Sequence, residues 1–455
     1  MSRIPSSYRD PNGYVFEHSG KIFRFINPGY FKHFDAATQS GLYNELFKKK
    51  WLVEHTEIES GQEFYSPELP AGKIILPAQI PFISYPYEWS FDMWKDAAVL
   101  TLKIAGISLN KGLILKDATP FNIQFLNGSP ILIDTLSFEK YEEGKPWIAY
   151  RQFCECFLAP LLLMHYCHHN THKLFSVYPN GIPLDMLVTL LPGKARWNLN
   201  TYLHIFLQKG IASGKTGSKQ GDNFSKKKME ILVNGLLDFV NSLKLKRSGS
   251  AWDDYYTGTI LGESYLNAKT VLVQSFLKEI QFETIIDLGA NEGHFSLLFQ
   301  KSAKQIISID GDANCINELY LSIKKKNFTN ILPLVNDLTA PSPSIGWDNN
   351  ERTSITGRLK GDVVFALALV HHLAIGHNLP LEFIARWLAK FGTYLLIEFI
   401  PKSDEKVKLL LLHRQDIFEG YTIENFKNIF LKYFEIIREE KVGETERTLF
   451  LMKKN

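Results

Sequence analysis

The chain has little cysteine, and its few thiols show no functional spacing. Four cysteines occur among 455 residues, at Cys154, Cys156, Cys167 and Cys315. This spacing matches neither a zinc knuckle nor a disulfide framework, so we expect reduced, mostly buried thiols and no metal site. Histidines after Cys156 leave a metal cluster open as an alternative, but a helix through residues 153–166 is the simpler interpretation.

Long hydrophobic runs are also absent. The first five residues lack the apolar stretch of a signal peptide. The longest apolar run, residues 157–164, contains Pro160 and is too short to span a membrane. A net charge of +3 gives no reason to expect nucleic acid as a partner. With 45% hydrophobic residues, the sequence predicts a cytoplasmic, soluble protein of two or three domains.

A change in composition marks the domain boundary. Glycine, serine and lysine dominate residues 209–228, as in flexible linkers. A helix is expected directly afterwards, because apolar residues recur at helical spacing over 228–245. We therefore expect an N-terminal domain at 1–208, a linker and connecting helix at 209–262, and a C-terminal domain at 263–455.

Short apolar strands alternate with helices after the linker, which predicts a parallel α/β sheet of Rossmann-like type. The expected strands are 284–288, 305–310, 330–335, 362–369 and 393–400, and the expected helices are 295–302, 313–326 and 381–390. Two late strands, 434–442 and 448–453, form a closing hairpin at Gly443. Dehydrogenases usually lack such a hairpin.

The first of these strands ends in a glycine turn that is also acidic. Asp287 ends the strand, Gly289 and Gly293 follow, and Glu292 lies within the turn. Two carboxylates would repel the pyrophosphate of a dinucleotide. They would attract S-adenosylmethionine, which carries an ammonium and a sulfonium group. The glycines let the backbone approach a ligand without a Cβ in the way, whereas Asn291 replaces the central glycine of the commoner Asp-x-Gly-x-Gly-x-Gly pattern.

Further carboxylates end the next two strands. Asp310 stands where a carboxylate accepts hydrogen bonds from both ribose hydroxyls. Asp337 follows the third strand, where it can accept a bond from the adenine amino group. Each of them alone also fits an ordinary loop or N-cap residue. Their order at successive strand ends favours a cofactor site.

Residues 263–455 resemble the class I S-adenosylmethionine-dependent methyltransferases. The resemblance rests on the Asp287 turn, Asp310, Asp337 and the end of the fourth strand at residues 368–373. It implies a seven-stranded sheet and cofactor contacts to the methionine moiety from Asp287, Gly289 and Gly293, to the ribose from Asp310, and to adenine from Asp337. Tyr255, Tyr256 and Tyr265 lie where such enzymes place a lid, although aromatic packing on the sheet explains them equally well.

Three residues are candidates for proton transfer. Methyl transfer depends mainly on positioning and water exclusion, and a base is needed only when the acceptor must lose a proton. His371 and His372, at the end of the fourth strand, are the first candidates, but they equally suit capping or contacts to methionine. Glu398, at the end of the fifth strand, is the second. No metal-ligand spacing indicates Mg²⁺ in this domain.

The N-terminal half reads as a separate α+β domain. We expect a hairpin over residues 14–26, helices at 36–49 and 89–106, strand-like segments at 52–58 and 82–85, and short strands over 113–138. Within it stand Asp117, Asn122 and, after a second hairpin, Asp134. A base and two metal ligands are what phosphoryl transfer needs.

This pattern resembles the catalytic loop of aminoglycoside-phosphotransferase-like and protein-kinase-like folds. The resemblance implies that Asp117 is the base, that Asn122 and Asp134 hold Mg²⁺, and that ATP binds. Leu115 replaces the usual histidine, however, Thr135 replaces the usual aromatic residue, and no glycine-rich phosphate loop precedes them.

The phosphate-gripping lysine of such folds also lacks a clear counterpart. Lys21 or Arg24 would have to replace it, with Glu45 as its partner. A degenerate accessory domain is therefore favoured. A bifunctional kinase–methyltransferase and a non-catalytic nucleotide-binding scaffold remain alternatives.

Both halves together resemble a bacterial group of long methyltransferases that includes rhizobial nodulation methyltransferases. Residues 86–90 and 147–153 contribute to this resemblance. It implies a small-molecule or saccharide acceptor, such as a lipid-linked glycan.

Overall fold

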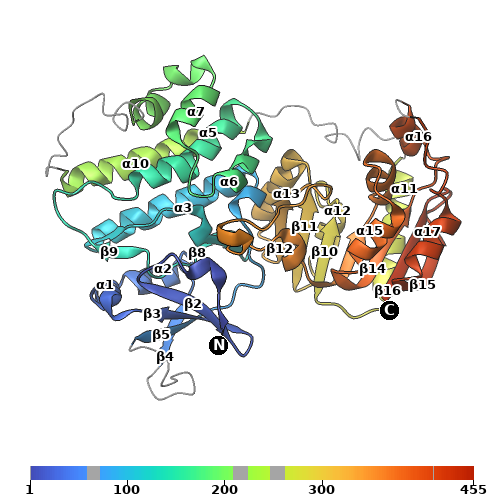
Figure 1. Cartoon of the computed structure of the whole chain (residues 1–455), viewed down its shortest axis with the longest axis horizontal. Coiled ribbons are helices and arrows are strands. Elements are labelled where there is room, and N and C mark those ends of the chain that lie inside the picture. Colours follow the sequence, from blue (N-terminus) through green and yellow to red (C-terminus); the bar gives the residue numbers. More distant parts are fainter. Residues whose placement is uncertain (1, 59–71, 209–223, 246–261, 413–414) are drawn as a thin grey trace. The chain divides into compact units, whose positions relative to one another are not determined.

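The computed structural model describes residues 2–58, 72–208, 224–245, 262–412 and 415–455. The chain forms two compact units, each with its own main sheet (Figure 1). The first unit comprises Met1–Lys246 together with Pro343–Ser354, and the second comprises Arg247–Ser342 together with Ile355–Asn455. The short return of the chain to the first unit at Pro343–Ser354 has no counterpart in the predicted domain boundaries.

A seven-stranded sheet forms the centre of the second unit. Its strands are β10 (Thr284–Leu288), β11 (Gln305–Asp310), β12 (Ile331–Val335), β13 (Gly361–Ala366), β14 (Gly392–Phe399), β15 (Phe434–Lys441) and β16 (Thr448–Lys454). Their order is β12-β11-β10-β13-β14-β16-β15, and β16 runs antiparallel to both neighbours. The predicted α/β class and the closing hairpin are thus confirmed.

Helices cover both faces of this sheet, because side chains of a strand alternate between the faces. On one face, the core contains Phe276 of α11 (Glu263–Leu277) and Leu319 of α13 (Ala313–Lys326). On the other, Phe426 of α17 (Ile423–Phe430) contacts the rings of Phe399 and Phe450. Strands buried on both faces form continuous apolar runs, which is why their positions could be read from sequence.

The strand order places a crevice beside β10. The chain runs from β10 through β11 to β12 on one side, and β13 and β14 lie on the other side. Such a reversal of strand order opens a crevice at the carboxyl ends of the strands, where α/β proteins bind ligands. The Asp287 turn and Asp310 follow these ends.

An antiparallel five-stranded sheet belongs to the first unit, with the order β1-β2-β3-β5-β4. Its strands are β1 (Ser2–Arg3), β2 (Gly13–His18), β3 (Lys21–Ile26), β4 (His55–Ile58) and β5 (Lys73–Pro77). Two small two-stranded sheets pair β6 (Leu113–Leu115) with β9 (Phe138–Lys140) and β7 (Ile123–Leu126) with β8 (Ser129–Leu132). The predicted mixture of strands and helices is present.

Two expected elements of this unit differ in the structure. The helix expected at 36–49 is two helices, α1 (Phe31–Gln39) and α2 (Leu42–Lys48), because Gly41 adopts a left-handed conformation with φ of 72° between them. Residues 82–85 form no strand. Instead, β5 pairs with β3 on the side away from β2, and this strand was not expected from the sequence.

The helical part of the first unit contains α3 (Phe91–Asn110) and α10 (Lys226–Ser242), which pack together, and a helical run at α4 (Tyr150–Phe153), η5 (Cys154–Leu158) and α5 (Ala159–Tyr166). All four cysteines are free thiols, and Cys167 is the exposed one. Within the described ranges, no three His, Cys, Asp or Glu residues group as metal ligands, and no helix is long and apolar enough to cross a membrane.

Candidate functional site

A cavity of about 340 Å³ lies in the second unit at the carboxyl ends of its central strands. The three predicted carboxylates, Asp287, Asp310 and Asp337, all line it. Gly289 and Asn291 of the turn line it as well. Residues from three successive strand ends therefore meet in one cavity, as their order in the sequence predicted.

Asp287 is buried beneath the turn. Its Oδ2 accepts a hydrogen bond from Ser296 Oγ at 2.6 Å, and Ser296 lies 2.7 Å from Ser308 Oγ. Burial raises the pKa of Asp287 to about 6, with Asp310 adding to the rise and Ser296 opposing it. A cation in the cavity would favour the ionised form of Asp287.

Asp310 fixes the turn to the second strand. Its Oδ2 accepts the backbone N–H of Asn291 at 2.8 Å, and its Oδ1 accepts that of Asp312 at 2.9 Å. Burial raises the pKa of Asp310, and these N–H groups oppose the rise. Each carboxylate oxygen can accept two hydrogen bonds, so both retain capacity for ligand hydroxyls.

The turn requires three left-handed residues. Gly289 and Gly293 each have φ of 77°, and Asn291 has φ of 51°. Asparagine adopts this conformation more readily than most residues with a Cβ, so Asn291 retains the shape that glycine gives elsewhere. The N–H groups of Gly289 and Ala290 both bond to Ile309 O, at 2.9 and 3.0 Å.

Gly293, expected to contact the methionine moiety, packs against a helix in the structure. A Cβ there would lie 2.5 Å from Leu319 Cδ1, and Gly293 does not line the cavity. The residue therefore allows the turn to pack against α13, whereas Gly289 lies at the cavity wall.

Asp337 follows β12 and forms a local turn. Its Oδ1 accepts the backbone N–H of Thr339 at 2.9 Å and the Thr339 hydroxyl at 2.7 Å. Thr339 and Leu338 line the cavity beside it. This fixes the carboxylate at the end of the cavity wall formed by the third strand.

A buried charged cluster adjoins the cavity, and its members Lys269, Arg447 and Asp404 were not expected from the sequence. Lys269 Nζ lies 2.6 Å from Glu398 Oε2, and the Tyr265 hydroxyl donates to Glu398 Oε1 at 2.5 Å. Arg447 donates to both oxygens of Asp404, at 2.8 and 3.0 Å. Burial alone would raise the pKa of Glu398, but Lys269 and Arg447 hold it below its ordinary value.

Glu398, expected as a candidate base, does not line the cavity and is fully buried. Its Oε2 also accepts the N–H of Ala368 at 2.9 Å. Ala368 lines the cavity with φ of 51°, a conformation that costs a residue with a Cβ on the order of 1–3 kcal/mol. Through this hydrogen bond, Glu398 helps to hold the backbone of Ala368, which forms the part of the cavity wall that follows β13.

The two neighbouring histidines differ in access to the cavity. His372 lines it, whereas His371 is fully buried and does not. Burial lowers the pKa of His372 to about 4 and that of His371 well below 6.5. Both rings are therefore neutral at pH 7, and His372 is the one that can meet a ligand.

The expected tyrosine lid is described only in part. Tyr265, on α11, lines the cavity and belongs to the buried charged cluster. Tyr255 and Tyr256 lie outside the described residues.

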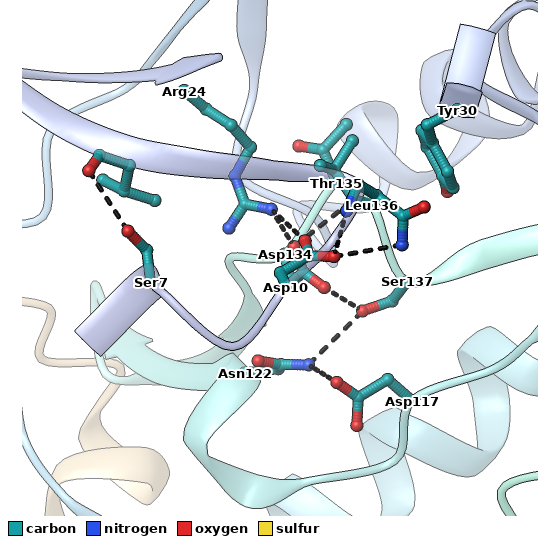
Figure 2. A network of polar contacts seen from close by, with 12 residues as sticks. Ser7, Asp10, Arg24, Tyr30, Asp117, Asn122, Asp134, Thr135, Leu136 and Ser137 are labelled. Carbon is teal, nitrogen blue, oxygen red and sulfur yellow. Dashed lines mark hydrogen bonds and ion pairs between the residues drawn. The ribbon is translucent and has the colours of Figure 1, made fainter. Parts of the chain in front are cut away.

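The three phosphotransfer candidates of the first unit lie together (Figure 2). Asn122 Nδ2 donates to Asp117 Oδ2 at 3.2 Å and to Ser137 Oγ at 3.3 Å. Ser137 Oγ in turn donates to Asp134 Oδ2. Burial, then the nearby Asp134, raises the pKa of Asp117, while Gln152 donates to its Oδ1 at 2.7 Å.

The side chain of Arg24 lies beside these three residues and already neutralises one of them. Arg24, on β3, forms an ion pair with Asp134, and its Nη1 lies 3.9 Å from Asp10 (Figure 2). Glu45 was expected to pair with Arg24 or Lys21. This prediction was wrong, because Glu45 pairs with Lys111 at 3.3 Å. Mg²⁺ would have to displace Arg24 from Asp134, so the residues present fit a Mg–ATP site poorly.

Comparison with known proteins gives one similarity over the full length. No protein-family model matches the chain. Nodulation protein NoeA of Rhizobium meliloti (strain 1021) is 31% identical over 465 residues, covering 100% of this chain and 96% of that protein.

Solved structures match smaller parts of the chain. N-methyltransferase NodS from Bradyrhizobium japonicum WM9, in complex with S-adenosyl-L-homocysteine, covers 45% of this chain and 93% of its own, with 11% identity and a TM-score of 0.34. The bifunctional kinase-methyltransferase WbdD covers 48% of this chain and 45% of its own, with 16% identity and a TM-score of 0.29.

Proposed function

Because the chain belongs to the family of the nodulation protein NoeA, we propose that it is an S-adenosylmethionine-dependent methyltransferase of small-molecule or glycan acceptors. In this proposal the second unit binds the cofactor and transfers the methyl group. The first unit is an accessory domain of kinase-like fold.

One observation carries the proposal: Asp287, Asp310 and Asp337 line one cavity at the crossover of a seven-stranded sheet. In S-adenosylmethionine, Asp287 would face the cationic methionine moiety, Asp310 the ribose hydroxyls and Asp337 the adenine amino group. A dinucleotide would bring its pyrophosphate among these carboxylates, which disfavours that alternative.

The cavity residues have distinct parts in this proposal. The bound cofactor supplies a methyl group activated on a sulfonium. The cluster of Lys269 and Glu398 holds the cavity wall and keeps water out, so that acceptor and methyl group are aligned. His372 accepts a proton from a hydroxyl or amine acceptor. Its pKa of about 4 makes it a weak base, so alignment supplies most of the rate.

A second candidate function, phosphoryl transfer in the first unit, is favoured by the convergence of Asp117, Asn122 and Asp134. The ion pair between Arg24 and Asp134 disfavours it. Mg²⁺-dependent ATP binding that is lost in Asp134→Ala would support this candidate. If the wild-type protein does not bind ATP, phosphoryl transfer is excluded and the first unit is an accessory domain.

Methyl transfer is tested with S-adenosylmethionine labelled in its methyl group, incubated with the full chain and a polar small-molecule and glycan extract of a bacterium that carries the gene. We expect label in an acceptor fraction with the wild type and none with Asp310→Ala. Asp416→Ala, at an exposed ion pair with Lys402, is the control that retains transfer. Equal labelling by Asp310→Ala and the wild type would refute the proposed site.

A further inference from the structure

A second, larger cavity of about 1010 Å³ lies within the first unit. Its lining includes Asp117, Asn122 and Asp134, and also residues of the segment Pro343–Ser354, among them Glu351 and Arg352. This volume is in the range of cavities that hold small molecules. We call Pro343–Ser354 the strap.

The strap is anchored to the first unit by Glu351. Its Oε1 accepts bonds from Arg9 Nη2 at 2.7 Å, from the Tyr8 hydroxyl at 2.6 Å and from the N–H of Trp347 at 2.9 Å. Burial would raise the pKa of Glu351, but the bonds from Arg9 and Tyr8 outweigh it and lower the pKa to about 2. The strap is therefore a built part of the cavity wall.

Arg352 follows directly and lies over an aromatic ring. Its guanidinium carbon is 4.3 Å from the centroid of the Phe121 ring, next to Asn122 in sequence. Its Nη1 donates one hydrogen bond, to Glu351 O at 3.0 Å. Burial lowers the pKa of Arg352. A guanidinium has five N–H donors, so most of this planar fork remains available to a partner.

The other cations of the cavity already have carboxylate partners. Arg24 pairs with Asp134, Lys116 pairs with Glu139 at 3.3 Å, and Arg9 pairs with Glu351. Among the described residues that line this cavity, Arg352 is the arginine or lysine in no ion pair. Withdrawing a charge from water is costly unless an opposite charge compensates, and a planar guanidinium matches carboxylate and phosphate best.

We propose that the first-unit cavity binds an oxyanion-bearing small molecule and that Arg352 holds its phosphate or carboxylate group. The rings of Phe121 and Tyr85 and the carboxylate of Asp117 leave room beside the oxyanion for a ring with hydroxyl groups. A sugar phosphate or sugar acid has this chemistry. The binding needs neither Mg²⁺ nor the second unit's cofactor, so it goes beyond the methyltransferase proposal.

The test measures binding of glucose 1-phosphate, glucuronate and glucose to the full chain by calorimetry at constant ionic strength, without Mg²⁺. These probes share a ring and differ in the oxyanion. We expect at least one charged probe to bind at least about tenfold more tightly than glucose, which corresponds to about 1.4 kcal/mol. The stronger of the two charged probes identifies phosphate or carboxylate as the preferred group.

Variants of Arg352 decide its role. Arg352→Lys keeps the charge but loses the planar fork, and we expect it to bind the charged probe about tenfold more weakly than the wild type does. Arg352→Gln should abolish the preference over glucose. Arg386→Gln is the matched control, because Arg386 also lies over a phenylalanine, Phe383, at 5.0 Å, but is exposed in the second unit.

Two results would overturn the inference: a wild type without preference for either charged probe, or an Arg352→Gln variant that keeps the preference. The thermal unfolding temperature of the same variant serves as the folding control, and we expect it to be unchanged. S-adenosylmethionine binding is measured beside it; since that readout belongs to the second unit, failure of the oxyanion site and failure of the methyltransferase proposal give different results.

Discussion

Lys269 Nζ lies 2.6 Å from Glu398 Oε2, with both side chains buried beside the cofactor cavity. The pair joins α11 to β14, and Glu398 also holds the strained backbone of Ala368. A buried pair of this kind does not add stability by itself, because desolvation offsets the attraction. Its effect is to fix the geometry of the cavity wall.

Glu398→Gln should therefore be strongly destabilising. It leaves Lys269 buried without its charge partner, which costs about 3–5 kcal/mol. Glu283→Gln is the matched control, since Glu283 pairs with Lys304 at 2.5 Å but both side chains are exposed. We expect that control to change the free energy of unfolding by less than about 1 kcal/mol. Urea denaturation of both variants measures the difference, and equal losses would contradict the role assigned to burial.

Cofactor affinity should depend on pH through Asp287. Its pKa is raised to about 6 in the folded chain, whereas an unfolded aspartate titrates near about 3.9. Without a cation, ionising it therefore destabilises the fold as pH rises from about 4 to about 6. S-adenosylmethionine reverses this preference, because its positive charge favours the carboxylate. Its affinity should rise as pH increases from 5 to 7.

Calorimetry in buffers of different ionisation heat tests this linkage directly. Near pH 5.5 we expect a proton to be released from Asp287 when the cofactor binds. The charged neighbours Asp310 and Lys269 also affect this titration, so Asp287→Asn is compared under the same conditions. An unchanged proton release in that variant would assign the pH dependence to another group.

Buried histidines should make the fold sensitive to acid. Burial lowers the pKa of His372 to about 4 and that of His371 well below its ordinary value. A histidine whose pKa is lowered on folding does not destabilise the fold above its unfolded pKa, near about 6.5. As pH falls below that value, the unfolded state takes up a proton more readily than the folded state, so the free energy of unfolding decreases. The melting temperature should fall between pH 6.5 and 4.5, and less steeply in His372→Gln. His168→Gln, at an exposed position of the first unit, should keep the wild-type slope.

Gly293→Ala should destabilise the second unit without a change in the cavity lining. The new Cβ would lie 2.5 Å from Leu319 Cδ1, and φ of 77° is unfavourable for alanine by about 1–2 kcal/mol. Gly235→Ala, in helix α10 with open space around its Cβ, should instead stabilise the chain by about 0.5–1 kcal/mol. Thermal unfolding of the two variants should shift in opposite directions. Equal shifts would contradict the packing account of Gly293.

The seven-stranded sheet could be predicted because its strands are short apolar runs between helices. The strand at Gln305–Asp310 and the helix at Ala313–Lys326 match their predicted bounds. The turn residues could be predicted for a different reason, because a left-handed backbone conformation favours glycine and asparagine. Gly41 shows the limit of such predictions. Its left-handed conformation splits an expected helix, and the split was not predicted because the amphipathic pattern continues across it.

Contacts between distant residues could not be read from the sequence. Lys269 and Glu398 are 129 positions apart, and neither has a local pattern that indicates a partner. Arg352 lines a cavity of the first unit although it follows β12 of the second. The expected partner of Arg24 was wrong because the fold, rather than helix position, brings Asp134 to it.

Equilibrium dialysis of radiolabelled S-adenosylmethionine at pH 7.5 tests the central claim most directly. The wild type and the control Asp416→Ala should bind one equivalent with the same affinity. Asp287→Ala should bind at least about tenfold more weakly, a loss of about 1.4 kcal/mol or more. Equal binding by Asp287→Ala and the wild type would contradict the assignment of this turn to the cofactor.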